Sequence, residues 1–133
     1  MKTIGVIPAR FASTRFPAKV LANINGKPLI WHVWEKVSLC QELDEVLIAC
    51  DHEEVFKAAQ SFKARVVMTN PKHPSGTDRI AQAVKDLKAD IVVNIQGDEP
   101  FIDPLTIDAL AVLLKKDAKI MMGTVIKAIV DDA

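Results

Sequence analysis

The chain has 133 residues, of which 50% are hydrophobic and 26% are charged, and its 17 basic side chains are balanced by 17 acidic ones. A formal net charge of zero argues against general binding to nucleic acid or to an anionic membrane surface, since both need a basic excess. The length suits one domain, and no apolar run approaches the ~20 residues of a membrane span. We therefore expect one globular domain without nucleic-acid or membrane partners.

The amino-terminal residues do not resemble a signal peptide, and the two cysteines, Cys40 and Cys50, have neither metal-binding nor redox spacing. A reducing compartment fits this pattern, so we expect a cytoplasmic protein whose cysteines are buried and inert.

In chain order, short apolar and β-branched runs alternate with stretches of helical periodicity. The predicted strands cover residues 2–7, 45–50, 64–68, 90–95 and 119–126, and the predicted helices cover 28–40, 52–60, 78–87 and 104–116. Asp51 is the expected N-cap of the second helix, Ser75 or Thr77 that of the third, and Asp103 before Pro104 that of the fourth.

The strands are too uniformly apolar for a sheet with one face in water, so the pattern predicts an α/β fold with a mostly parallel sheet covered by helices on both faces. In such sheets, ligands bind beyond the carboxyl ends of the strands. Three polar segments follow strands and should open onto that edge: PARFASTRFPAK, TNPKHPSGTDR and QGDEP. We expect the functional site where these segments meet.

The first of these segments is cationic and lacks glycine. Arg10, Arg15 and Lys19 are spaced along it, with the hydroxyls of Ser13 and Thr14 between them. A triphosphate carries about four negative charges, and guanidinium groups bind phosphate oxygens in bidentate fashion. The segment could therefore bind a triphosphate through side chains, but its spacing alone suits a solvated loop equally well.

The segment QGDEP places Asp98 and Glu99 after an otherwise apolar strand. Mg²⁺ typically takes one or two protein carboxylates and completes its shell with water and phosphate oxygens, so Asp98 could bind a metal–triphosphate complex. Gln96 has both a donor and an acceptor for the edge of a base. On composition alone, Asp98 and Glu99 are better explained as turn residues before Pro100, and Gln96 could be a turn residue with a satisfied amide.

At this point four ordered motifs resemble a known family. IPARFASTRFPAKVL, NGKPLIWHV, HPSGTDR and VNIQGDEPFI are similar to the amino-terminal half of the 3-deoxy-manno-octulosonate (Kdo) cytidylyltransferases. The resemblance implies a Rossmann-like, three-layer α/β/α fold of the nucleotide-diphospho-sugar transferase type. It also implies transfer of CMP from CTP to the anomeric hydroxyl of Kdo, with release of pyrophosphate and with Mg²⁺ as cofactor, for lipopolysaccharide synthesis.

The resemblance assigns roles to residues of the cationic segment. Arg10 and Lys19 would bind the triphosphate and take part in catalysis, and Ser13 and Arg15 would support them. The family commonly has glycine where this chain has Ala18, so the backbone of the segment is expected to differ there.

The resemblance also assigns the base and metal contacts. Gln96 would help to read cytosine, Asp98 would bind Mg²⁺ and act in catalysis, and the SGTDR segment would complete the CTP pocket through Ser75 and Arg79.

Members of the family are roughly twice as long as this chain, so residues 1–133 are interpreted as a nucleotide-binding α/β domain without the carboxyl-terminal half. That half is expected to supply a second metal ligand, most of the Kdo pocket and the contacts of a homodimer. Two alternatives remain open: a nucleotidyltransferase for another sugar, and a truncated nucleotide-binding module without catalysis. The chain alone is expected to bind CTP–Mg²⁺ weakly and to form no CMP-Kdo.

Overall fold

The computed structural model describes residues 2–11, 19–70, 76–84, 87, 89–95, 102–116 and 125–127, with the backbone alone at 76–78 and 125–127. Its main sheet has five strands, and their bounds are β1 (Thr3–Ala9), β4 (Glu45–Cys50), β5 (Val66–Met68), β6 (Ile91–Asn94) and β7 (Val125–Lys127). The helices are α1 (Leu29–Ser38), α2 (Glu53–Ser61), α3 (Gly76–Val84) and α4 (Pro104–Lys116). A one-turn 3₁₀ helix, η1 (Lys19–Leu21), and a small hairpin, β2 (Asn23–Ile24) and β3 (Lys27–Pro28), precede α1.

The main sheet has the order β5-β4-β1-β6-β7, and every strand pair in it is parallel. From β1 the chain moves outward through β4 to β5, and then returns to the other side of β1 for β6 and β7. The direction of winding therefore changes beside β1, which is the position where open α/β sheets bind ligands. The predicted α/β fold with a mostly parallel sheet is confirmed.

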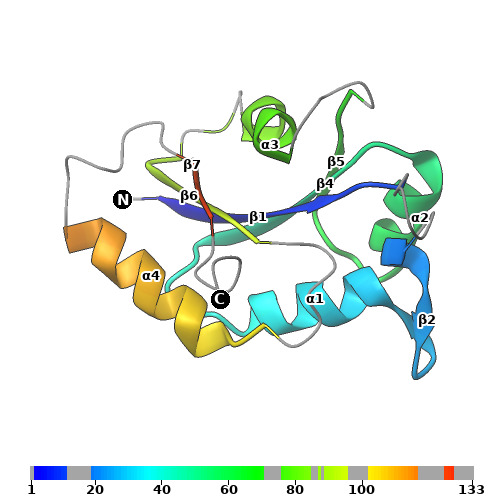
Figure 1. Ribbon diagram of the computed structural model, residues 1–133, viewed down its shortest axis with the longest axis horizontal. Helices are drawn as coiled ribbons and strands as arrows, with labels where there is room; N and C mark the ends of the chain where they lie inside the picture. The colour runs from blue at the N-terminus through cyan, green and yellow to red at the C-terminus, as the bar shows by residue number, and fades with distance from the viewer. Residues whose placement is uncertain are drawn as a thin grey trace.

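Helices cover both faces of the sheet (Figure 1). The side chains of Ile4 and Val6 pack with Ile80 of α3 on one face, whereas Ile7 and Ala9 face the cluster formed by α1, α2 and α4. Alternate residues of β1 are thus buried on opposite faces, because successive side chains of a strand point in opposite directions. This double burial explains why the strands are apolar throughout.

The predicted elements are confirmed within the described residues, with β5 and β6 shorter than predicted. The prediction for Asp103 is also confirmed, since its Oδ1 accepts a hydrogen bond from the backbone N–H of Leu105 at 2.9 Å. The prediction for Asp51 is wrong. The N-cap of α2 is His52, whose Nδ1 accepts from the backbone N–H of Glu54 at 3.1 Å, and the Asp51 carboxylate is used elsewhere, as described below.

The hairpin of β2 and β3 was not anticipated, although its turn has a clear sequence signal. Asn25 and Gly26 both have positive φ, 52° and 88°, as a two-residue hairpin turn of type I′ requires. The Asn23 side chain accepts from the backbone N–H of Gly26 at 2.9 Å and closes the turn. None of the helices in the described parts of the chain is both long and apolar enough to cross a membrane.

Replacement of Ile80 by Ala should lower the free energy of unfolding by about 2–5 kcal/mol, because the side chain is fully buried and its loss leaves a cavity between α3 and the sheet. Leu113→Ala is the matched control, since that leucine is 63% exposed on α4. Urea unfolding of both variants measures the difference. Equal stabilities for the two variants would contradict the packing described here.

Candidate functional site

The carboxyl ends of β1, β4 and β6 bring distant parts of the chain together. Ala9 pairs with Cys50 in the sheet, so the residues that follow β1 lie next to those that follow β4. On the other side of β1, the backbone N–H of Ile95 donates to the carbonyl oxygen of Val6 at 2.9 Å. The chain therefore leaves β1 after Ala9 and β4 after Cys50 at the same edge of the sheet, and Ile95, directly after β6, lies beside β1. The sequence predicted this edge for the segments after β1, β5 and β6, but not for the residues after β4.

Phe11, the last described residue before the gap at 12–18, has two contacts with the residues after β4. Its backbone N–H donates to Oδ1 of Asp51 at 2.9 Å. Its ring stacks on the imidazole of His52, with 3.8 Å between the centroids and 14° between the planes. The beginning of the cationic segment is thus fixed to the end of β4 through both its backbone and its side chain.

Arg79 of α3 lies on the other side of the Asp51 carboxylate and is completely buried. Its Nη1 donates to Oγ1 of Thr69 at 2.8 Å and lies 3.5 Å from the carbonyl oxygen of Asn70. Its Nη2 lies 3.5 Å from Oδ2 of Asp51, whose side chain is only 8% exposed. Within the described parts of the chain, Nε and Nη2 have no hydrogen-bond partner. A buried arginine with spare donors is costly unless a nearby charge compensates it, and Asp51 provides that charge.

Thr69 and the residue after it connect α3 to the end of β5. The Thr69 hydroxyl donates to the carbonyl oxygen of Cys50 at 2.8 Å and also accepts from Arg79. The side-chain oxygen of Gln82 accepts from the backbone N–H of Asn70 at 2.9 Å. Helix α3 is therefore attached, through Arg79 and Gln82, to the same edge of the sheet as Phe11.

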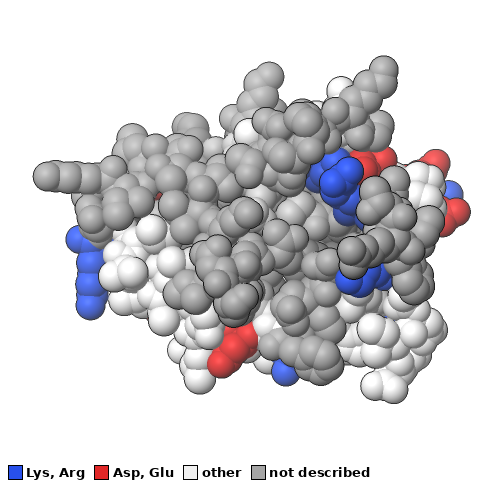
Figure 2. Space-filling model, viewed as in Figure 1, with Lys and Arg blue, Asp and Glu red and all other residues white. Residues whose placement is uncertain are grey.

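The local charge at this edge is positive. Burial lowers the pKa of the Arg79 guanidinium, Asp51 opposes that change, and the nearby charge of Arg10 lowers the pKa further. Arg10 and Arg79 are therefore close enough to repel each other, and among the described residues Asp51 is the carboxylate that offsets this repulsion at Arg79. Figure 2 shows basic atoms, with acidic atoms next to them, at the end of the molecule where β1 and β4 finish. The charges of this cluster favour an anion, even though the whole chain is neutral.

Three of the predicted site residues lie in the described part of the chain. Arg10 is exposed just after β1, Lys19 is exposed at the start of η1, and Arg79 of α3 is buried next to Asp51. Lys19 is next to the buried Val20, which belongs to the core cluster and fixes the position of η1. The other predicted residues are Ser13, Arg15, Ser75, Gln96 and Asp98, and they lie outside the described residues.

Within the described ranges, no group of three or more His, Cys, Asp and Glu side chains could bind a metal ion. Because Asp98 is outside those ranges, the Mg²⁺ site stays a prediction. Two residues that the sequence analysis did not assign to the site, Asp51 and Thr69, contact Arg79 directly. Their position directly after strands at the expected ligand edge is the signal that could have identified them.

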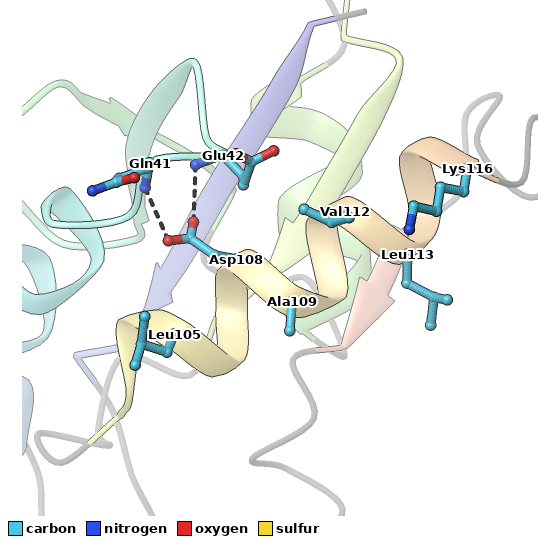
Figure 3. Close-up of a pocket in the computed structure, with 8 residues that line it drawn as sticks. All are labelled: Gln41, Glu42, Leu105, Asp108, Ala109, Val112, Leu113 and Lys116. Atoms are coloured by element: carbon cyan, nitrogen blue, oxygen red, sulfur yellow. Dashed lines mark hydrogen bonds between the residues drawn. The ribbon is translucent and has the colours of Figure 1, made fainter.

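A separate hollow lies on the outer side of α4, beside the segment that precedes β4 (Figure 3). It measures about 520 Å³ and includes the exposed side chains of Leu105 and Leu113. The Asp108 carboxylate accepts from the backbone N–H groups of Gln41 and Glu42 at 3.1 and 2.9 Å and attaches α4 to that segment. The hollow is thus next to the amino end of β4, away from the cationic edge.

The cysteines are unsuited to act as nucleophiles. Both are free thiols. Burial raises the pKa of the Cys40 thiol to about 12, with further increases from Asp108 and Asp103. Burial likewise raises the pKa of the Cys50 thiol to about 11. Since only the thiolate is a good nucleophile, the prediction that both cysteines are inert agrees with their environment.

The raised thiol pKa values predict that stability falls in alkaline solution. In the unfolded chain the thiols ionise near their ordinary pKa of 9.0, whereas in the folded chain they stay protonated up to about 11 and 12. Raising the pH above 9 therefore favours the unfolded state. Urea unfolding between pH 8 and pH 10.5 should show this decrease, and Cys40→Ala should make it smaller. The same decrease in Cys40→Ala and in the wild type would contradict this assignment.

The hydroxyl of Thr69 should contribute to stability, whereas that of Thr3 should not. Thr69→Val removes the acceptor of a buried arginine and should cost about 1–3 kcal/mol. Thr3→Val is the matched control, because the Thr3 hydroxyl is buried without a hydrogen-bond partner among the described residues, and its removal should leave stability unchanged or higher. Denaturant unfolding measures both, and a Thr69→Val variant as stable as the wild type would contradict the role of this contact.

Comparison with known proteins agrees with this geometry. The chain is 52% identical over 130 residues to a 3-deoxy-manno-octulosonate cytidylyltransferase of Solibacter usitatus, covering 98% of this chain and 52% of that protein. It is 47% identical over 119 residues to an 8-amino-3,8-dideoxy-manno-octulosonate cytidylyltransferase of Shewanella frigidimarina, covering 87% and 49% of the two chains. The chain thus spans about half the length of the curated relatives it matches.

Among solved structures, CMP:2-keto-3-deoxy-manno-octonic acid synthetase in complex with CTP superposes with a TM-score of 0.86 at 41% identity, over 88% of this chain and 48% of that one. A nucleotidyl transferase of Methanothermobacter, at 23% identity and a TM-score of 0.73, shares the fold. A family model described as cytidylyltransferase matches residues 4–132. The resemblance inferred from the four sequence motifs is thereby confirmed, and the chain belongs to the cytidylyltransferase family.

Proposed function

We propose that this chain is the CTP-binding part of an enzyme that transfers CMP from CTP to the anomeric hydroxyl of Kdo and releases pyrophosphate, a step in lipopolysaccharide synthesis. One observation carries the proposal: the synthetase solved in complex with CTP matches 88% of this chain at 41% identity. The positive edge of the sheet, where Arg10 and Arg79 lie close together, is suited to a triphosphate.

The chemistry that the proposal requires is mainly positioning and charge stabilisation. The sugar hydroxyl attacks the α-phosphorus of CTP, a new P–O bond forms, and the bond to the departing pyrophosphate breaks. Arg10, with Arg15, stabilises the pyrophosphate, and Lys19 neutralises charge on the oxygens of the α-phosphate. Arg10 and Lys19 are both exposed in the structure, as contact with a nucleotide requires.

The remaining roles follow the sequence prediction. Gln96 reads cytosine, and Ser13 and Ser75 donate their hydroxyls to the nucleotide. Arg79, which is fully buried in α3, supports the pocket from a position near Arg10. A homodimer stays a prediction from the resemblance, and a cytoplasmic location stays a prediction from the cysteine pattern and the amino-terminal residues.

Mg²⁺ is proposed as the cofactor on the chemistry of the available donors. The described residues have no cluster able to enclose a metal by themselves. A site made of one carboxylate, from Asp98, together with phosphate oxygens and water is the kind that Mg²⁺ commonly occupies. When bound, Mg²⁺ would reduce the negative charge on the triphosphate.

The experiment that tests the proposal is calorimetric titration of the chain with CTP and with UTP, each with Mg²⁺. We expect preferential binding of CTP. Lys19→Ala should weaken it about tenfold or more, because a charge-assisted contact to phosphate is lost. Lys36→Ala is the matched control, since Lys36 is equally exposed but lies at the end of α1. Absence of CTP binding, or equal affinities for the two lysine variants, would contradict the proposal.

A pyrophosphate-release assay distinguishes the alternatives in the same samples. Kdo and 8-amino-3,8-dideoxy-manno-octulosonate should both be offered, because a relative named for the amino sugar is 47% identical to this chain. Release with one sugar identifies the substrate. Binding of CTP–Mg²⁺ without release agrees with a nucleotide-binding part that lacks the sugar pocket.

A further inference from the structure

We propose that Asp51 is a positioning residue for nucleotide binding, which orients Arg10 through the backbone of Phe11 while it compensates the buried charge of Arg79. The proposal rests on the proposed function, since Arg10 is there a ligand of the triphosphate. The Asp51 carboxylate itself contacts neither the sugar nor the nucleotide.

The hydrogen bond from Phe11 to Asp51 restrains the backbone of Arg10. The N–H that donates to Oδ1 of Asp51 at 2.9 Å belongs to the peptide plane that begins at the carbonyl carbon of Arg10, and that plane is rigid. Fixing this N–H therefore fixes the backbone of Arg10 at the point where it leaves β1. The stack of the Phe11 ring on His52, at 3.8 Å between centroids, restrains the same residue through its side chain.

The other oxygen of the Asp51 carboxylate is held by Arg79. Oδ2 of Asp51 lies 3.5 Å from Nη2 of the fully buried Arg79. Thr69 and Asn70 fix Arg79 from the end of β5, so the carboxylate cannot move toward Phe11 without leaving a buried guanidinium uncompensated. Asp51 therefore has one defined orientation, and it transmits that orientation to Arg10.

Arg10 and Arg79 are two like charges, and Asp51 connects them. The charge of Arg10 is close enough to lower the pKa of Arg79, and the Asp51 carboxylate bonds to the backbone next to one of them and forms an ion pair with the other. Without that carboxylate the repulsion between the two guanidinium groups would be stronger, and Arg10, which is exposed, is the one that can move away.

The decisive experiment is the effect of Asp51→Asn on CTP affinity, measured by calorimetry with Mg²⁺. Coulomb attraction alone predicts tighter binding, because the variant loses a negative charge near a polyanion. If Asp51 positions Arg10, the Asp51→Asn variant should instead bind CTP more weakly. We expect the dissociation constant to rise about tenfold or more, with the stoichiometry per folded chain unchanged. An affinity equal to or higher than that of the wild type would overturn the proposal.

Asp44→Asn is the matched control. The Asp44 carboxylate accepts from the backbone N–H of Thr3 at 2.7 Å, so it makes the same kind of contact with β1 at the opposite end of that strand. This variant should bind CTP within about twofold of the wild type, since the change is far from the carboxyl edge. Equal losses of affinity in both variants would show a general effect on the strand and would overturn the proposal.

A second variant covers the case in which Asp51→Asn does not fold. His52→Asn retains a side-chain acceptor for the N-cap of α2 but removes the ring that stacks on Phe11. It should raise the dissociation constant for CTP by about threefold, because one of two restraints on the Arg10–Phe11 peptide is lost. Unchanged affinity would overturn the proposal.

Amide hydrogen exchange of the wild type separates failure of this inference from failure of the proposed function. The Phe11 N–H should exchange at least about tenfold more slowly than in an unstructured peptide, because it is hydrogen-bonded to a buried carboxylate. Exchange at the unstructured rate would mean that the Asp51 contact does not form, whatever the affinity for CTP. Slow exchange together with no CTP binding would instead contradict the proposed function, and the role of Asp51 in nucleotide binding with it.

Discussion

The parallel pairing of β1 with β4 on one side and β6 on the other determines where every feature of the site lies. β1 is hydrogen-bonded along both edges, and its side chains are buried on both faces, so a shift of one residue would move its apolar side chains to the wrong faces. The register that pairs Ala9 with Cys50 is therefore fixed by the core. Phe11 meets Asp51 and His52 because of that register, and the cationic segment has a defined starting point for the same reason.

The site combines a neutral protein with a positive edge. Arg79 is fully buried and Asp51 almost so, and burying such a pair contributes little or nothing to stability compared with apolar side chains. The position of the Arg79–Asp51 pair at the edge where the strands end is suited to ligand binding rather than to stability. The pair, together with Arg10, creates a local field that favours an anion. The zero total charge gives no basic excess of the kind that general binding to nucleic acid needs.

Much of the fold could be predicted, because the strands are continuous β-branched runs and α4 begins with the cap signal of Asp103 and Pro104. The misassignment of Asp51 has a physical cause: the residue before a helix is an N-cap on local grounds, and only tertiary structure brings it to Phe11, 40 residues earlier. The burial of Arg79 could not be predicted either, since arginine is almost never fully buried unless it is paired. Its partners Asp51 and Thr69 follow two different strands, β4 and β5, and only the folded sheet brings them together. The motifs located the ligand edge, but not the contacts that connect its parts.

The large sequence separations within the site have a consequence for folding. Phe11 and Asp51 are 40 residues apart, and Arg79 and Thr69 belong to a still later part of the chain. Contacts of this kind form slowly, because closing long loops costs entropy before any contact compensates it. The carboxyl edge of the sheet is thus complete only after β1 and β4 have paired, so a partly folded chain lacks the contacts of Asp51 with Phe11 and Arg79. A ligand that binds there can stabilise the finished domain by mass action, but it cannot guide the early steps that build it.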